Sequence, residues 1–344
     1  MNFLNLAFEE ALNAVGVSSP NPAVGAVVVK DGAVVGRGHT QTVGGAHAEV
    51  MALRNAGNAA DGATLYVTLE PCCHYGRTPP CTDAIIAAGI SRVFFAHPDP
   101  NPKVRGKSGQ VLAAAGILSS LKTPPEEFSS FYEAYDFFVQ NGTPFVECKI
   151  AETANGCISQ SDKKPLKITG ECADEWVAKW RRSAEYILVG GGTVRMDNPR
   201  LTVRGVVGNS PRPIVFCATA AIPPDLRLFQ NTAKKPLVYS RVPRRELESV
   251  AEVHLLPAEN FAENWQAFIS DLAKKGVHRL AVEMGASLAK NLLHFGLWNR
   301  LYVIRSPQIF PNGFFWRTGE EPPLRQIKML GKDSLWTALH AENQ

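Results

Sequence analysis

Three residues able to bind zinc and one carboxylate able to transfer a proton lie between residues 47 and 81. The motif HAE supplies His47 and Glu49, and two proline–cysteine pairs supply Cys72 and Cys81. One imidazole and two thiolates leave the fourth position of a tetrahedral zinc free for water, as catalytic zinc sites do. Glu49 stands two residues after the histidine and can reach that water without binding the metal. The pattern predicts a zinc-activated water beside a carboxylate, which is hydrolytic chemistry.

The order H-x-E followed by P-C is the pattern of zinc deaminases, which usually continue as P-C-x-x-C. Here an eight-residue insertion separates Cys72 from Cys81, and it carries His74 and Arg77. A single histidine is more often structural, and two cysteines can also belong to a closed zinc site. The ordered set of HAE, EPC and PPC favours the catalytic interpretation. Cys73, beside the ligand Cys72, is predicted to be structural.

Length and composition indicate a two-domain enzyme of the cytoplasm. The chain has 344 residues, 45% of them hydrophobic and 20% charged, which is enough for two cores. A net charge of +4 without a concentrated basic block does not indicate nucleic-acid binding, but it is compatible with small anionic substrates. Residues 1–16 have the spacing of an amphipathic helix rather than a signal peptide, and no apolar run approaches a membrane span. Seven cysteines fit reduced thiols and a metal site better than disulfides.

Strands alternating with helices predict a three-layer α/β domain in the first half. After the N-terminal helix, strands are predicted at 23–29, 33–38, 63–69 and 92–96, and helices at 47–55, 82–88 and 110–115. A turn at Lys30-Asp31-Gly32 joins the first two strands as a hairpin. Both ligand-bearing segments are expected to follow a strand and open a helix. Cys72 and Cys81 would then lie near helix N-termini, where the dipole favours thiolate.

A proline-bearing break at 122–127 and an aromatic helix at 128–140 precede a linker around 141–145. A second α/β series begins there. Its predicted strands are 145–150, 186–189, 213–217, 236–240, 279–283 and 300–305, and its predicted helices are 173–183, 261–275 and 287–295. The sequence therefore predicts two domains, residues 1–143 and residues 144–344, without an internal repeat.

Five short stretches of the first half form a recognisable set. They are PNPAVG at 20–25, GH at 38–39, HAE at 47–49, TLEPCCHYGRTPPC at 68–81 and DPNP at 99–102. Together they resemble the bifunctional deaminase/reductase family of riboflavin biosynthesis, and the long insertion discriminates it from nucleoside and tRNA deaminases. The resemblance implies an N-terminal cytidine-deaminase-like three-layer domain followed by a dihydrofolate-reductase-like α/β domain. It also implies Zn²⁺ and NADPH as cofactors.

The resemblance implies a substrate and a reaction as well. A zinc-activated hydroxide would attack the amine-bearing ring carbon of 2,5-diamino-6-(5-phosphoribosylamino)pyrimidin-4-one, and Glu49 would carry protons to a ring nitrogen and to the departing ammonia. NADPH would then reduce the ribosyl chain to ribityl. The residues that match family positions holding the base, ribose or phosphate are Asn21, His39, His74, Arg77 and Asn101. An arginine suits a phosphate, which it binds bidentately, although His74 and Arg77 could also be solvated loop residues.

The second half carries a glycine turn at 190–192, directly after a predicted strand. Such a turn can bring backbone amides close to a dinucleotide phosphate, but it is not a G-x-G-x-x-G fingerprint and is weak alone. Carried over by resemblance, the residues that bind NADPH would be Thr193, Asp197, Gly285, Ala286, Ser287 and Leu288. The residues that bind the reductase substrate would be Arg181, Leu201, Arg204 and Glu283. The two arginines could clamp its phosphate, or they could form surface salt bridges.

The second half departs from the family's pattern at four positions. Asn155 stands in TANG, where the family usually has Ser-Leu-Asp-Gly. Pro165 and Lys167 replace the serine and the tryptophan of Gly-Glu-Ser-x-Trp-Ile-Thr, and Met284 replaces a glycine. These changes leave a second interpretation open, in which the chain is a deaminase only. The C-terminal domain would then merely bind ligand or support a dimer.

Two other classes of protein remain as alternatives. One is a non-catalytic, zinc-stabilised interaction protein, and the other is a nucleoside or tRNA deaminase. The long insertion, the whole second domain and the lack of a basic face argue against the latter. The predicted partners are a small phosphorylated pyrimidine and further copies of the same chain, as a dimer or tetramer. Neither nucleic acid nor membrane is expected as a partner.

Overall fold

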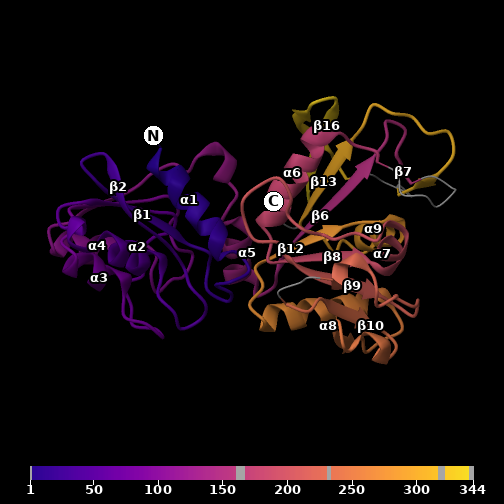
Figure 1. The fold of residues 1–344 in the computed structure, drawn as a ribbon, viewed down its shortest axis with the longest axis horizontal. Coiled ribbons are helices and arrows are strands. Elements are labelled where there is room, and N and C mark those ends of the chain that lie inside the picture. Colours follow the sequence, from indigo (N-terminus) through magenta and orange to yellow (C-terminus); the bar gives the residue numbers. More distant parts are fainter. Residues whose placement is uncertain (1, 160–166, 231–233, 317–321, 341–344) are drawn as a thin grey trace. The chain divides into compact units, whose positions relative to one another are not determined.

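The computed structural model describes residues 2–159, 167–230, 234–316 and 322–340. The chain divides into two compact units, Met1–Gly142 and Thr143–Gln344. Each unit is built around its own sheet, with the first coloured indigo to purple and the second magenta to yellow (Figure 1). None of the helices in these residues is long and apolar enough to cross a membrane.

The sheet of the first unit has five strands in the order β2-β1-β3-β4-β5. Their bounds are Gly25–Lys30 for β1, Ala33–His39 for β2, Thr64–Val67 for β3, Arg92–Phe95 for β4 and Leu118–Leu121 for β5. β1 is antiparallel to β2 and β3, whereas β3, β4 and β5 are parallel. The predicted hairpin is confirmed, because Asp31 and Gly32 both have positive φ, at 49° and 78°, as a tight two-residue hairpin turn requires. β5 was not predicted, since its Leu-Ser-Ser-Leu sequence lies at an exposed edge.

Helices cover both faces of this sheet, which confirms the three-layer prediction. α1 (Phe3–Ala14) begins at Asn2, whose side chain accepts the Leu4 N–H, and packs so tightly on β1 that a Cβ at Gly25 would lie 1.9 Å from the Ala7 carbonyl oxygen. α2 (Ala48–Ala56) packs equally tightly on Gly36 and Gly38 of β2. Gly25 pairs with His39, and the next residue of β1, Ala26, pairs with Gly38. Because side chains alternate between the faces of a sheet, Gly25 and Gly38 belong to opposite faces. The two helices that pack on them therefore lie on opposite sides of the sheet.

The remaining helices of the first unit differ from prediction mainly at their ends. They are η1 (Gly57–Ala60), α3 (Cys81–Ala87), α4 (Ser108–Ala114), η2 (Glu126–Phe128) and α5 (Glu133–Asn141). The single aromatic helix predicted at 128–140 is therefore broken after a short 3-10 turn. Phe128 and Tyr132 from this region are buried in the same core as Phe8 of α1, and the Phe8 and Phe128 rings stack at 4.7 Å. Packing of these rings, rather than helical periodicity, determines this segment.

The sheet of the second unit has nine strands in the order β11-β10-β9-β8-β12-β6-β13-β16-β15. Their bounds are β6 (Phe145–Glu152), β8 (Tyr186–Gly190), β9 (Arg212–Cys217), β10 (Leu237–Ser240), β11 (Glu252–Leu255), β12 (Arg279–Glu283), β13 (Arg300–Arg305), β15 (Arg325–Leu330) and β16 (Asp333–Leu339). All are parallel to their neighbours up to β13, and β16 and β15 are antiparallel. β7 (Cys157–Ser159) pairs with β14 (Phe314–Phe315) in a separate sheet. The six predicted strands are confirmed. Four of the five unpredicted ones are short, exposed or at a sheet edge, and the fifth, β16, lies between β13 and β15.

The helices of the second unit are α6 (Glu171–Arg182), α7 (Gly191–Asp197), η3 (Arg227–Phe229), η4 (Arg245–Leu247), α8 (Phe261–Lys274) and α9 (Ala286–His294). The three predicted helices are found, and Asn260 caps α8 by accepting the Glu263 N–H at 2.9 Å. α7 was not predicted, because two glycines at its start are poor helix formers. Core clusters on the two faces of the sheet contain Trp265 and Phe268 of α8 on one side and Trp180 of α6 on the other.

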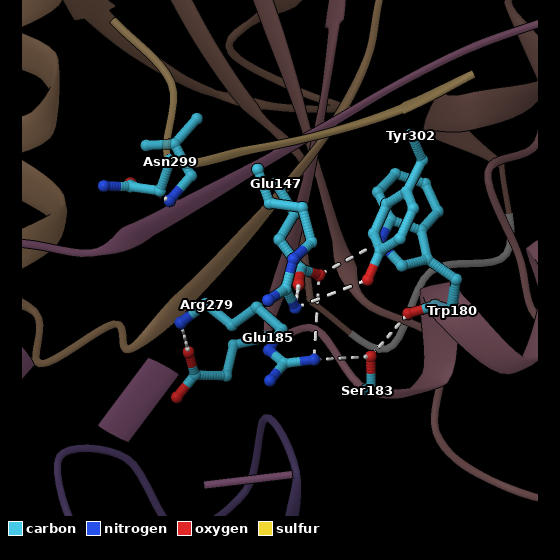
Figure 2. A network of polar contacts seen from close by, with 9 residues as sticks. Glu147, Trp180, Ser183, Glu185, Arg279, Asn299 and Tyr302 are labelled. Carbon is cyan, nitrogen blue, oxygen red and sulfur yellow. Dashed lines mark hydrogen bonds and ion pairs between the residues drawn. The ribbon is translucent and has the colours of Figure 1, made fainter. Parts of the chain in front are cut away.

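A buried ionic network joins the starts of the central strands (Figure 2). The Glu147 carboxylate of β6, only 1% exposed, accepts the Trp180 Nε1–H at 3.0 Å and lies 3.6 Å from Arg279 and 3.5 Å from Arg300. Arg279 begins β12 and also donates to the Ser183 hydroxyl at 3.3 Å. One carboxylate therefore connects α6 to the three neighbouring parallel strands β12, β6 and β13, near the amino ends of these strands.

We predict that Glu147→Ala destabilises the second unit by about 3 kcal/mol, since removing one partner of a buried ion pair leaves charge uncompensated. Urea unfolding followed by tryptophan fluorescence measures the change. Glu252→Ala is the matched control, because Glu252 pairs with Arg212 while about half exposed, and such pairs contribute about 1 kcal/mol or less. Equal effects of the two substitutions would contradict a central role for Glu147.

Candidate zinc centre and reductase site

Two of the three predicted zinc ligands lie at helix N-termini. His47 is the N-cap residue of α2, and Cys81 is the first residue of α3. Cys72 does not open a helix, contrary to expectation, because α3 begins nine residues later. Its sulfur nevertheless accepts the Cys81 backbone N–H at 3.2 Å. A free amide at the start of α3 therefore reaches the Cys72 sulfur, which favours the thiolate form of Cys72.

The three ligand atoms converge at one point and lie within 4.8 Å of one another. His47 Nδ1 is 3.6 Å from Cys72 Sγ and 3.3 Å from Cys81 Sγ. A tetrahedral zinc with bonds of about 2.3 Å to sulfur and 2.0–2.1 Å to nitrogen would separate these atoms by about 3.6 Å. The other ring nitrogen, Nε2, lies 3.4 Å from the Thr78 hydroxyl, the kind of contact that orients a metal-bound histidine. The residues present fit a zinc ion with a fourth position left free.

The two sulfurs and the neighbouring Glu49 carboxyl group all have shifted pKa values. A hydrogen bond from the Cys81 thiol, assisted by His47, lowers the pKa of Cys72 far below its ordinary range, against the effect of burial. The same hydrogen bond and burial raise the pKa of Cys81. Burial raises the pKa of Glu49 to about 7, and the nearby Cys72 sulfur adds to this effect. A carboxyl group with such a pKa is equipped to accept and to return a proton near neutrality.

A cavity of about 270 Å³ opens onto this centre. Glu49, His47 and Cys72 line it together with four of the five predicted substrate residues, which are Asn21, His74, Arg77 and Asn101. The fifth, His39, is not among the lining residues, and its ring lies 3.5 Å from Glu10 of α1. Cys73 is also outside the trio, with its sulfur 3.9 Å from the Lys103 carbonyl oxygen.

Four residues that sequence reasoning missed belong to the same site. Thr78 contacts His47, and Glu70, Asp99 and Tyr135 line the cavity. Glu70 and Asp99 stand within the EPC and DPNP stretches, so the motifs already contained a signal for them. Burial raises the pKa of Asp99 to about 6, and the Tyr135 hydroxyl lies 3.5 Å from its Oδ1. Tyr135 comes from α5, and no sequence signal distinguished it from the other aromatic residues there.

The predicted cofactor residues come together where two strands end. Gly190 ends β8, and Thr193 and Asp197 follow on α7. Gly285 caps α9, whose first turn holds Ala286, Ser287 and Leu288. A Cβ at Gly285 would lie 2.5 Å from Thr193 Oγ1, so a larger residue there would force the Thr193 side chain to move. The glycine turn, Ser287 and Leu288 also line a second cavity of about 330 Å³.

Two of the predicted reductase substrate residues, Arg181 and Glu283, meet at the end of β12. Arg181 donates to Glu283 Oε1 from two nitrogens, at 2.7 and 2.6 Å, and to the Thr202 carbonyl oxygen at 3.0 Å. Lys149, which was not predicted, lies 3.8 Å from Glu283 Oε2. Although burial opposes it, Lys149 and Arg181 lower the pKa of Glu283. Burial, and then Glu283, raise the pKa of Asp197, which connects this cluster to the cofactor residues.

Leu201 and Arg204 follow in an irregular segment. Leu201 has a φ of 57° and is only 2% exposed, an unusual conformation for a bulky residue. Its side chain lies in the core, so Leu201 presents almost no surface to a ligand. Arg204 is exposed and makes no hydrogen bond or ion pair with the residues that the structure describes.

The departures from the family's pattern have specific structural roles where they are described. Met284 is buried in the main core of the second unit, and its N–H donates to the Lys149 carbonyl oxygen at 3.0 Å. The Asn155 amide bonds both the carbonyl oxygen and the N–H of Phe310, at 2.8 and 3.3 Å. Lys167 forms an exposed ion pair with Asp174. Pro165 lies outside the described residues.

Comparison with known proteins decides the family. The sequence profile of the cytidine and deoxycytidylate deaminase zinc-binding region matches residues 1–97, and that of the RibD C-terminal domain matches residues 144–322. The riboflavin biosynthesis protein RibD of Aquifex aeolicus is 36% identical over 315 residues, covering 91% of this chain and 88% of that protein. The chain belongs to the RibD family. The RibD protein of Escherichia coli is 35% identical, covering 84% of this chain and 83% of its own length.

Solved structures agree with this assignment over the whole chain. A structure from Thermotoga maritima, described as a diaminohydroxyphosphoribosylaminopyrimidine deaminase/5-amino-6-(5-phosphoribosylamino)uracil reductase, matches with a TM-score of 0.79 and 29% identity, covering 98% of both chains. The predicted fold class is thereby confirmed, with a cytidine-deaminase-like domain followed by a RibD reductase domain. The chain is a bifunctional deaminase and reductase of riboflavin biosynthesis. Its cofactors are Zn²⁺ and NADPH.

We predict that Cys81→Ser lowers the zinc content from about one ion per chain to near zero, because a catalytic site has only three protein ligands. Metal analysis of the purified, dialysed protein measures this. Cys73→Ser is the matched control, since its sulfur lies outside the ligand trio, and it should retain the metal. Zinc loss in the Cys73 variant, or retention in the Cys81 variant, would contradict the assigned ligand set.

Proposed function

We propose that residues 1–143 deaminate 2,5-diamino-6-(5-phosphoribosylamino)pyrimidin-4-one by hydrolysis and that residues 144–344 then reduce the ribosyl chain of the product to ribityl with NADPH. The observation that carries the first step is the convergence of the His47, Cys72 and Cys81 ligand atoms within 4.8 Å of one another, beside a cavity that His47, Cys72 and Glu49 line. The names of the similar proteins, together with matches to both halves, support the sequence of two steps.

In the deaminase domain, the chain's own residues hold the metal and move protons. A bound zinc supplies an activated water, by lowering its pKa towards neutrality. His47, oriented by Thr78, and the two cysteines hold the ion. Glu49 is 4% exposed and lines the cavity. It can take one proton from the water and deliver it to the ring nitrogen. It can then take the second proton from the newly added hydroxyl group and deliver it to the amine, which leaves as ammonia.

Hydrogen-bond accounting assigns separate tasks to the substrate residues. Asn101 Oδ1 already accepts the Lys103 N–H at 3.0 Å, so its NH₂ group is the part that remains for a substrate acceptor. Arg77 is exposed at the rim of the cavity and suits the phosphate, which a guanidinium binds bidentately. His74 and Asn21 line the cavity and are proposed to contact the base or ribose. His39 has no such support, because its ring faces Glu10.

In the reductase domain, positioning is the main task, because hydride transfer is the chemistry of the cofactor. We propose that Thr193, Asp197 and residues 285–288 hold NADPH and that Arg181, Leu201, Arg204 and Glu283 hold the substrate. The two arginines differ in their availability. Arg181 is engaged by Glu283 and the Thr202 carbonyl, so the phosphate is assigned to the exposed Arg204.

The alternative, a deaminase with an inactive second domain, is disfavoured by two observations. Met284 fills the core without leaving an unpartnered N–H, and the Lys149–Glu283–Arg181 cluster is intact. We also propose that the enzyme is cytoplasmic and a dimer or tetramer. The seven free cysteines support a reducing compartment, and light scattering of the purified protein tests the oligomeric state.

We predict that Glu49→Gln retains about one zinc per chain but lowers the rate of ammonia release by at least about 100-fold, since the amide cannot transfer the proton. Ammonia release from the aminopyrimidine substrate and metal analysis measure the two effects. Glu9→Gln, on the exposed side of α1, is the control for the same chemical change. Deamination by the Glu49 variant at near the wild-type rate would exclude the proposed proton carrier.

We predict that the full chain oxidises NADPH when given the deaminated product and does not do so without it. Absorbance at the nicotinamide band and mass analysis of the ribityl product measure the reaction. Glu283→Gln should slow it, because Lys149 and Arg181 lose the carboxylate charge that holds them. Ammonia release with no NADPH oxidation would instead support the deaminase-only alternative.

A further inference from the structure

One loop forms much of the cavity wall opposite the metal ligands. It runs from residue 99 to residue 108, and Asp99, Asn101 and Val104 line the cavity that Glu49 and His47 also line. The loop has little regular structure, being bends and turns until α4 begins at its end. A recognition surface built on such a segment needs an anchor, because a loop otherwise samples many conformations.

Glu70 contacts both ends of this loop. Its Oε2 accepts the Asp99 N–H at 3.3 Å, both of its oxygens accept the Gly106 N–H, at 3.0 and 3.1 Å, and its Oε1 accepts the Ser108 hydroxyl at 2.7 Å. The residue is only 3% exposed. It forms no ion pair with a lysine or arginine among the described residues, so these donors carry the burden of stabilising its charge.

The geometry separates Glu70 from direct substrate recognition. An ionised carboxylate offers about four lone-pair sites. Three donors from the loop already contact the two oxygens, and one of them, the Gly106 N–H, is shared between both. Glu70 also belongs to the segment that carries the metal ligand, because Cys72 is two residues further along the chain. The backbone N–H of Glu70 donates to the His97 carbonyl oxygen at 2.8 Å. Glu70 therefore lies between the Cys72 segment and the 99–108 loop, and both of its carboxylate oxygens are already hydrogen-bonded to the loop.

We propose that Glu70 is a positioning residue of the deaminase site, which holds the 99–108 loop in its substrate-binding conformation against the segment that carries Cys72. This inference rests on the proposed deamination. The loop brings Asn101 to the cavity, and its anchor lies at the loop's two ends, at Asp99 and at Gly106 and Ser108. Loss of the anchor should therefore weaken substrate binding before it affects the metal.

Glu70→Gln replaces one of the two carboxylate oxygens by an NH₂ group. The Gly106 N–H contacts both carboxylate oxygens, so in either orientation of the glutamine the NH₂ group faces a backbone donor. Ser108→Ala is a second, milder variant, because it deletes one donor without creating such a clash, and it lies 36 residues along the chain from Cys72. Glu127→Gln, at an exposed position, controls for the change of glutamate to glutamine.

The test uses the full, zinc-loaded chain. For Glu70→Gln we expect KM for the aminopyrimidine to rise about tenfold and kcat to fall by about threefold or less, as for the loss of a hydrogen bond to a charged group. Ser108→Ala should raise KM less. Zinc content and NADPH oxidation on the deaminated product should equal those of Glu127→Gln. Hydrogen exchange of the Asp99 and Gly106 amides should be faster in Glu70→Gln.

The opposite outcomes are distinct. An unchanged KM together with unchanged exchange at Asp99 and Gly106 would overturn the inference. Loss of zinc in proportion to activity, with KM unchanged, would also overturn it, because Glu70 would then serve the metal segment alone. Failure of the wild-type and Glu127→Gln chains to release ammonia would instead contradict the proposed deamination, and the exchange measurement would still decide whether Glu70 anchors the loop.

Discussion

The close approach of His47 Nδ1 to two cysteine sulfurs is the constraint on which the first unit depends. The three atoms come from segments 25 and 34 residues apart, so the sheet must deliver them to one point. Gly36 and Gly38 of β2 allow α2 to pack against the strand at a distance that no larger residue permits, which determines where His47 lies. α3 begins at Cys81 and directs its first amide to Cys72. The distances between the three ligand atoms thus depend on the glycines of β2, which set the position of α2, and on the residue at which α3 begins.

Much of this arrangement could be predicted from the sequence, because its signals are local. The H-x-E motif, the proline–cysteine pairs and the Asp31-Gly32 turn each depend on neighbouring residues. The contacts of Glu70 could not be predicted, since its partners lie 29 to 38 residues away. Tyr135 was missed for a similar reason, as an aromatic residue on a helix gives no indication of which cavity it will line. β15 was missed because it is the edge strand and five of its six residues are exposed. β16 lies inside the sheet with a nearly alternating burial pattern, but its residues were not interpreted as a strand.

In the second unit, residues that depart from the family's motifs still pack in the core or form hydrogen bonds with the backbone around them. Met284 replaces a small residue, yet its side chain joins the core while its N–H remains bonded to β6. Asn155 pairs with both polar groups of the Phe310 backbone, a role that needs a donor and an acceptor and that a carboxylate could fill only in part. The charged cluster at the end of β12 is independent of both residues. Met284 and Asn155 therefore change the residues that support the site, whereas the charged cluster of Lys149, Glu283 and Arg181 keeps its contacts.

The loop between Cys72 and Cys81 performs two tasks with one piece of chain. It carries His74 and Arg77 at the cavity, and its Thr78 contacts the ring of His47. Because the proposed zinc ligands Cys72 and Cys81 stand at the two ends of this loop, removal of the metal would loosen the segment that carries the proposed substrate residues. Starvation for zinc would thus cost the cell affinity as well as chemistry at this step, and adding substrate in excess would not restore the flux.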